Sequence, residues 1–126
     1  MPGAGLLFLI IKRITMSHKT NESLISALNN CAAVCNHCIT ACLDEEEVKM
    51  LAKCIKLDID CAEICSLIPG FLARGSAHAS HLMAECADIC NACAEECEKH
   101  THMEHCKECA EACRKCAEAC LQMEYV

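Results

Sequence analysis

Residues 86–120 read CADICNACAEECEKHTHMEHCKECAEACRKCAEAC, and their pattern indicates the architecture of the whole chain. It holds two runs of the pattern C-x3-C-x2-C-x3-C, and cysteine and alanine are almost the only residues in it that can form a buried face. Each residue advances an α-helix by about 100°, so steps of four, three and four keep the sulfurs within one stripe. The stretch therefore predicts two helices that each turn a row of thiols towards the interior.

The same pattern runs through the rest of the chain. Residues 31–42 repeat it, and residues 54–65 keep its frame with Asp58 in the place of one cysteine. A helix bundle normally fills such positions with Leu or Ile. Every cysteine of the chain fits the scheme, and these are Cys31, Cys35, Cys38, Cys42, Cys54, Cys61, Cys65, Cys86, Cys90, Cys93, Cys97, Cys106, Cys109, Cys113, Cys116 and Cys120.

Start and stop signals predict four helices with short connections between them. They are expected over residues 20–43, 44–74, 76–99 and 101–124. Consecutive helices joined by short turns lie antiparallel. The predicted fold class is therefore all-α, an antiparallel up-down-up-down four-helix bundle with a cysteine-lined core.

The signals that give these boundaries are capping residues and helix breakers. Gly75 has the place of a helix C-terminal stop, and Pro69 is expected to kink the second helix or to break it early. The expected N-terminal caps are Thr20 or Asn21, Asp44 with Glu47, Ser76, and Thr101 with Glu104.

The 126 residues fit one domain, preceded by an extension. Residues 17–126 are expected to form the cysteine-lined bundle, and residues 1–16 an extension that either precedes a natural start at Met16 or forms a short docking helix. The extension has an apolar run, residues 4–11, that comes before the basic residues, whereas a signal peptide has its basic residues first. The run is also too short to span a bilayer. We therefore expect no membrane partner and a cytoplasmic location, where thiols stay reduced.

The composition argues against a disulfide scaffold. Sixteen cysteines exceed the roughly 8–10% that usually marks one, yet the chain has only 4 Gly and 2 Pro, and strong helix formers fill the spaces between cysteines. The net charge of −7 comes from acidic residues interleaved with Lys and Arg, which indicates a solvated outer face and no nucleic-acid partner.

Several readings of the cysteine rows compete. In one interpretation the cysteines only pack the core, but a bundle core built from such small side chains would be under-packed. In another they form disulfides between helices, which require a specific geometry and an oxidising compartment. Zinc and iron–sulfur ligands usually come from loops that wrap the metal, which a straight helix does not do. Disulfides stay open as a minor alternative.

Cu(I) suits a helical thiol array better, because it is soft, prefers thiolates and accepts few ligands. Sulfurs at i and i+4 of one helix are close neighbours, so a pair can hold one ion and shared thiolates can extend the sites along the axis. Many equivalent sites imply capacity and hence storage of multiple Cu(I) ions per chain. The pairs are 31/35, 38/42, 61/65, 86/90, 93/97, 109/113 and 116/120.

The two ends of the predicted bundle differ. One end is expected to be closed by the inward residues Leu24, Leu28, Ile68, Leu72, Leu82 and Met123. At the other, the cysteine frame continues to Glu47 and to candidate ligands at an entrance, which are Met50, His100, His102 and His105. Asp58 lies inward and is a candidate ligand, a hydrogen-bond acceptor beside the ligands, or the partner of a lysine.

These residues resemble the bacterial four-helix-bundle copper storage proteins, and within them the cytosolic branch. The resemblance covers about residues 23–123 and rests on the C-x3-C frames and on the stretches CIKLDIDCAEIC (54–65) and ECEKHTHMEHCKECAEACRKCAEAC (96–120). It implies Cu(I) bound inside each bundle by cysteine pairs, an open end with histidines, and a homotetramer. Pro69-Gly70 and the apolar extension depart from the family pattern.

The function expected from the sequence is cytosolic storage of Cu(I) without a catalytic cycle. The alternative is a detoxifying thiol buffer for several soft metals such as zinc, cadmium and copper. The expected partners are Cu(I) ions and further copies of the chain, and a copper chaperone is a candidate partner.

Overall fold

The computed structural model describes the backbone of residues 2–122 and the side chains of residues 21–122. Helices make up most of this range, which contains no β-strand. Their order is α1 (Pro2–Leu43), η1 (Val48–Leu51), α2 (Ala52–Ala73), α3 (Ala79–Cys97), η2 (Glu98–His100) and α4 (Glu104–Gln122), where η denotes a short 3₁₀ helix. The predicted all-α class is confirmed.

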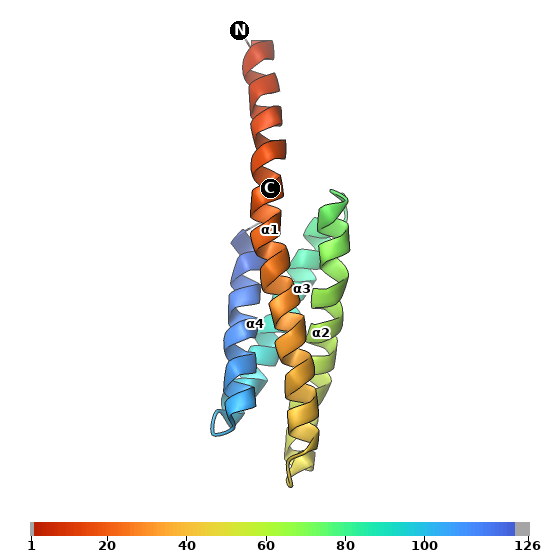
Figure 1. The fold of residues 1–126 in the computed structure, drawn as a ribbon, viewed down its shortest axis with the longest axis vertical. Coiled ribbons are helices and arrows are strands. Elements are labelled where there is room, and N and C mark those ends of the chain that lie inside the picture. The colour runs from red at the N-terminus through yellow and green to blue at the C-terminus, as the bar shows by residue number, and fades with distance from the viewer. Residues whose placement is uncertain (1, 123–126) are drawn as a thin grey trace.

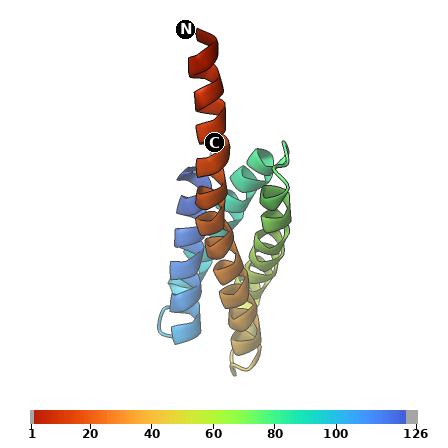
Figure 2. The same cartoon turned by 45° about the horizontal axis from the view of Figure 1, so that its top comes forward.

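The four long helices form an antiparallel bundle (Figure 1). Helix α1 packs against α2 and α4, and α3 packs against the same two helices, so that each helix has two neighbours around a common axis. The N-terminal turns of α1 extend well beyond the ends of the other helices (Figures 1 and 2). The predicted up-down-up-down topology is confirmed, and it brings all four cysteine rows to one axis.

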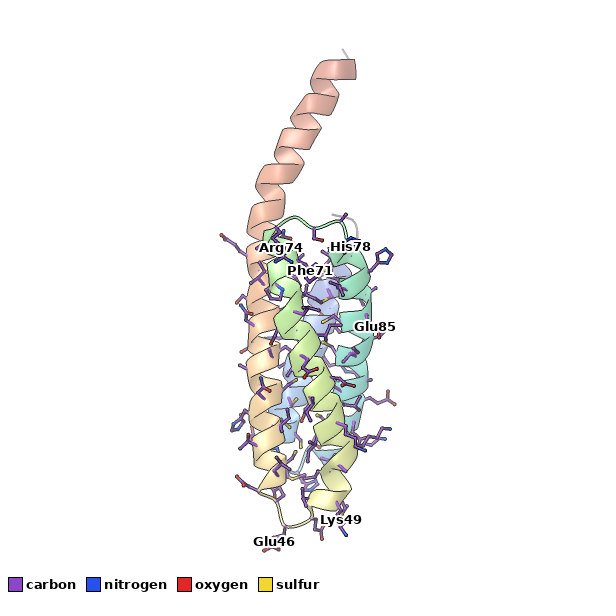
Figure 3. The ribbon with its side chains drawn as sticks, turned by 90° about the vertical axis from the view of Figure 1, so that its right-hand side faces the viewer. Glu46, Lys49, Phe71, Arg74, His78 and Glu85 are labelled. Carbon is purple, nitrogen blue, oxygen red and sulfur yellow. The ribbon has the colours of Figure 1, made fainter. Side chains whose placement is uncertain are left out.

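Aliphatic side chains close one end of this axis. Leu24 and Leu28 of α1 are buried there with Ile68 and Leu72 of α2, and Leu82 of α3 is half-buried against them. Figure 3 shows Phe71, Arg74 and His78 at this end, and Glu46 and Lys49 at the opposite end. The predicted hydrophobic closure is confirmed for these residues, whereas Met123 lies outside the described residues.

Alanine lines the contacts between neighbouring helices. In six places the residue that follows a cysteine is a buried alanine, and these are Ala32, Ala62, Ala87, Ala94, Ala110 and Ala117. A methyl group takes little room, so two helices can approach closely enough for the sulfurs of both to meet on the axis. The small core residues thus determine the distance between helices as well as the contents of the core.

Two predicted helix starts are wrong. Helix α1 begins at Pro2 instead of Thr20 or Asn21. Residues 6–43 contain neither Gly nor Pro, so nothing interrupts the helix there. A residue that can cap a helix does not by itself end one that already includes the residues before it. Helix α2 begins at Ala52 instead of Asp44. The amide of Asp44 still donates to the carbonyl of Thr40, which closes α1, and a turn and η1 follow.

Pro69 lies inside α2 without ending it, so of the two expected effects, a kink or an early break, the early break does not occur. The helix continues to Ala73 because the proline lies near its C-terminus, where one missing amide donor costs little of the remaining hydrogen-bond ladder. Gly75 acts as the stop, as predicted, with a positive φ of 65°. Its amide donates to the Leu72 carbonyl (3.0 Å) and the next amide, of Ser76, donates to that of Phe71 (2.9 Å), which forms a Schellman motif.

The last two helices also start later than their predicted caps. Ser76 accepts a hydrogen bond from the amide of His78 (3.2 Å), but α3 begins only at Ala79. Helix α4 begins at Glu104, so this residue is the first of the helix instead of the third, as a capping box with Thr101 would require. The predicted end of α4 at residue 124 lies outside the described residues.

The division into an extension of residues 1–16 and a bundle of residues 17–126 stays a prediction. The backbone of α1 runs through the proposed boundary without a break. Within residues 2–122, no helix combines the length and the apolar character needed to cross a membrane.

Truncating the aliphatic closure should destabilise the bundle. We expect Leu28→Ala to lower the free energy of unfolding of the metal-free chain by about 2–5 kcal/mol, because Leu28 is fully buried and its loss leaves a cavity. Urea unfolding followed by circular dichroism measures the change. Leu43→Ala, at an exposed position of the same helix, is the control and should cost less than about 1 kcal/mol. Equal losses in the two variants would contradict the proposed closure.

Candidate metal centre

All sixteen cysteines lie in the interior of the bundle as free thiols. Fifteen have no exposed surface, and Cys120 is 2% exposed. They come from all four long helices, and the frame of four-, three- and four-residue steps predicted this inward direction for every one of them. The centre of the molecule is therefore a continuous column of sulfur atoms.

Thiols one turn apart on the same helix lie close together. The Sγ–Sγ distances are 3.8 Å for Cys38 and Cys42, 3.8 Å for Cys86 and Cys90, and 4.0 Å for both the 61/65 and the 109/113 pairs. A metal–thiolate bond is about 2.3 Å long, so an ion can bond both sulfurs of such a pair at once. Four of the predicted pairs thus have the spacing that a shared ion requires.

Contacts between helices are as short as those within them. The Sγ atoms of Cys54 on α2 and Cys97 on α3 are 3.3 Å apart, and those of Cys61 on α2 and Cys90 on α3 are 3.5 Å apart. Cys35 of α1 lies 3.7 Å from Cys109 of α4. The two thiols of a pair on one helix therefore also contact thiols of other helices. The spacing of cysteines along the sequence does not predict these contacts.

These contacts assemble the thiols into groups of four whose sulfurs all lie within 4.8 Å of one another. One group, here named the mouth group, lies nearest the histidines and consists of Cys38, Cys42, Cys54 and Cys106. Four others, here named the inner groups, are in order along the bundle 35/93/109/113, 31/35/61/113, 31/61/65/90 and 65/86/90/116. Each inner group shares two cysteines with the next, whereas the mouth group shares none with these four.

Asp58 lies between the mouth group and the inner groups. Its side chain has no exposed surface, and its Oδ1 accepts from the thiols of Cys93 (3.0 Å) and Cys109 (3.2 Å) while Oδ2 accepts from Cys54 (3.8 Å). Thiols surround the carboxyl, which fits the role of a hydrogen-bond acceptor beside candidate ligands. Burial raises the pKa of the Asp58 carboxyl to about 8, because the charged form loses its hydration.

Burial also favours the protonated form of two thiols near the entrance, those of Cys42 and Cys106, in the metal-free chain. It raises the pKa of Cys42 to about 11 and that of Cys106 in the same direction. A metal ion needs the thiolate, so an ion that binds here must release protons. The ion also supplies the positive charge that makes a buried thiolate tolerable.

His105 is the one predicted histidine that reaches the thiols. Its Nδ1 lies 3.7 Å from the Sγ atoms of Cys38 and Cys42 and 3.6 Å from that of Cys106. It thereby joins three members of the mouth group, on α1 and α4. The continuation of the cysteine frame from Cys109 back to residue 105 was the sequence signal for this position.

The other predicted entrance residues lie around a cavity of about 480 Å³ at the same end. His100 is half-buried, with its Nε2 3.1 Å from Oε2 of Glu96, and His102 is exposed with its ring centroid 6.4 Å from that of His100. Met50 also lines the cavity but is 65% exposed. The structure thus gathers these residues at one mouth, without contact to the thiols.

The inward placement predicted for Met50 and Glu47 is wrong. Both are exposed, and Leu51 takes the inward position with 2% exposure. The frame was extended from α2 at 100° per residue, but residues 48–51 form the 3₁₀ helix η1, which turns by about 120° per residue. A change of helix type therefore rotated the side chains away from the predicted stripe.

Sequence reasoning missed the residues that support the entrance. Met103, which lines the cavity, and Glu45 and Glu96, which contact His105 and His100, were not predicted as site residues. Glu96 precedes His100 by one helical turn, a spacing that could have indicated it. Glu45 meets His105 only through the packing of α1 against α4, so no local signal existed.

The profile of a protein family described as copper storage protein matches residues 17–125. The chain belongs to the copper storage protein family. A relative from Bacillus subtilis (strain 168), the uncharacterized cysteine-rich protein YhjQ, is 46% identical over 90 residues, which are 71% of this chain and 82% of the relative. The predicted family membership is confirmed.

Solved copper storage proteins share the fold of this chain. The Cu(I)-bound copper storage protein BsCsp3 is 44% identical with a TM-score of 0.79, and the match covers 83% of this chain and 98% of that one. A cytosolic copper storage protein from Streptomyces lividans, with five coppers, is 36% identical with a TM-score of 0.85, over 89% of this chain and 98% of that one.

Asp58 should make the stability of the metal-free chain depend on pH. Its pKa is raised in the folded state, so the stability it contributes is present below its unfolded pKa near 4 and is lost as the pH rises towards 8. The loss from this group should approach about 1.4 kcal/mol per pH unit within that window. We expect Asp58→Asn, which resembles the protonated acid, to remove it.

Urea unfolding of the metal-free chain at a series of pH values under anaerobic conditions measures this effect. Asp60→Asn is the matched control, because Asp60 is exposed on the same helix. The variant Asp58→Asn should equal the parent near pH 4 and exceed its stability at pH 8. A parent and variant with parallel pH profiles would refute the assignment.

Proposed function

We propose that this chain stores Cu(I) ions as thiolate complexes inside the bundle. The observation that carries the proposal is the column of sixteen buried, free thiols in mutually contacting groups of four. A single structural site needs four ligands and no connected array. An array in which most sulfurs neighbour several others suits a soft ion that accepts few ligands and shares thiolates.

The proposed ligands are the sixteen cysteines, with the mouth residues as sites of entry. We propose that His105, which lies beside the mouth group, binds an ion together with it through Nδ1, and that His100, His102 and Met50 bind ions transiently at the cavity. Imidazole and thioether groups hold Cu(I) less firmly than a thiolate array, so ions would pass inwards. Asp58 is proposed to accept hydrogen bonds from thiols and to lie within reach of ions in either neighbouring group.

Storage without a catalytic cycle, in the cytosol, is the setting that we propose. The family to which the chain belongs is one of copper storage, and the similar Streptomyces lividans protein is described as cytosolic. A reducing compartment keeps the thiols free, which the proposed chemistry requires. A copper chaperone is the kind of partner that would deliver ions to the mouth.

We further propose that the chain forms a homo-oligomer, a tetramer by resemblance to the family. Ile39 of α1 and Ile59 and Leu67 of α2 line a surface groove of about 450 Å³, and the latter two are exposed. Apolar side chains gathered in this way favour contact with another chain. Sedimentation analysis tests the proposal, and a monomer at micromolar concentration would contradict it.

Addition of Cu(I) to the reduced chain should load many ions. Sixteen thiols would hold about eight ions if each ion took two unshared thiolates, and more if thiolates bridge. Native mass spectrometry under anaerobic conditions counts them. The double variant Cys38→Ala/Cys42→Ala should hold fewer ions, whereas Asn36→Ala, an exposed position on the same helix, should match the parent.

Two outcomes would reject the storage proposal. One is a parent that saturates at one or two ions per chain, and the other is a freshly purified chain that shows few free thiols to a thiol reagent. Loading in competition with zinc and cadmium separates copper storage from a general soft-metal buffer. We expect Cu(I) to displace both metals, and failure to displace them would favour the buffer.

A further inference from the structure

Glu45 lies beside the histidine that touches the thiols. It belongs to the turn between α1 and η1, and its Oε1 lies 3.2 Å from Nε2 of His105 on α4. The histidine side chain is 12% exposed and the glutamate side chain 42% exposed. The contact therefore joins a residue on the rim of the mouth to one that faces the interior.

The chemistry of this contact determines the state of the ring. An ionised carboxylate only accepts hydrogen bonds, so Nε2 of His105 must carry the proton and donate it. In the neutral ring the lone pair is then on Nδ1. Nδ1 is the nitrogen that lies 3.6–3.7 Å from the sulfurs of Cys38, Cys42 and Cys106. The ring thus presents its Nδ1 lone pair to the mouth group.

The same arrangement occurs a second time at the mouth. Nε2 of His100 lies 3.1 Å from Oε2 of Glu96, a side chain that is almost fully buried, and this pairing leaves the other ring nitrogen of His100 free. The Oε1 of Glu96 meets Lys99 at 3.3 Å and Lys53 at 3.8 Å, so its position is determined by several partners. Both histidines at this entrance thus have Nε2 beside a carboxylate, although only His105 has Nδ1 next to thiols.

We propose that Glu45 is a positioning residue that holds His105 in the Nε2–H tautomer and directs Nδ1 to a Cu(I) ion on its way to the mouth group. Carboxylates that accept the second N–H of a metal-binding histidine orient the ring and strengthen it as a ligand. An exposed pair of this kind contributes little to stability, so its role here is orientation. The inference rests on the proposed storage function, and its first test does not use copper.

The tautomer of His105 in the metal-free chain is the first test. Nitrogen-15 NMR of the labelled imidazoles reports which ring nitrogen carries the proton, and His105→Ala assigns the signal. We expect the Nε2–H tautomer in the parent and a mixture in Glu45→Ala. Glu45→Gln, whose amide oxygen can still accept from Nε2, should restore the parent tautomer. Glu46→Ala is the matched control, since Glu46 lines the same cavity.

The rate of copper loading is the second test. Cu(I) supplied as its bicinchoninate complex is transferred to the reduced chain in a stopped-flow spectrometer, where the loss of the donor colour reports uptake. We expect Glu45→Ala to slow the first phase about tenfold without a change in final capacity. In a His105→Ala background the same substitution should have no further effect, because Glu45 acts through the ring.

The outcomes separate the two proposals. An unchanged tautomer in Glu45→Ala, or an equal slowing by Glu45→Ala with and without His105, would overturn the positioning role. Equal slowing by Glu46→Ala would also overturn it, because the charge of the rim would then explain the rate. A parent chain that removes no Cu(I) from the donor would instead reject the storage function, whatever the tautomer.

Discussion

The cost of burying a charged sulfur governs this molecule. A thiolate in the interior loses its hydration and must find a positive charge, while a neutral thiol is small and forms weak hydrogen bonds. The column of cysteines is therefore stable in two ways, as protonated thiols or as thiolates around metal ions. Without metal, the bundle depends for cohesion on the aliphatic residues at the closed end and on the alanine contacts between helices. The same residues keep the sulfurs close enough to bind an ion jointly.

The direction of every cysteine side chain could be predicted because it depends on local geometry alone. A row such as Cys31 to Cys42 needs only the helical turn to place its sulfurs on one stripe, and the short connections between helices then predict the antiparallel topology. Predictions failed where the helix type or its limits depended on other contacts. The predicted inward position of Met50 failed because the 3₁₀ geometry of η1 has no simple sequence signature. The predicted start of α1 failed because the helix is continuous through the residues that were expected to cap it.

The partners of the predicted residues were harder to foresee than the residues themselves. The repeat suggested pairs such as Cys61 and Cys65, but the rotation of α2 relative to α3 brings Cys90 closer to Cys61 than Cys65 is. Similarly, His105 was predicted as an entrance residue, whereas its contact with Glu45 arises from the packing of two helices distant in sequence. Contacts between helices thus determine which thiols lie next to one another. Sequence periodicity determines only which side chains face the interior.

The sharing of cysteines among groups has a consequence for how an ion would travel. Because each inner group has two cysteines in common with the next, an ion could cross between them by exchanging one thiolate at a time and would never become free. The mouth group has no such common member with those four, and the carboxyl of Asp58, which contacts Cys54 on one side and Cys93 and Cys109 on the other, occupies the junction. The Sγ atom of Cys54 also lies 3.3 Å from that of Cys97, so thiols as well as the carboxyl line the step from the mouth group inwards. The column would then consist of a small group of thiols that an ion reaches first and a larger connected set behind it.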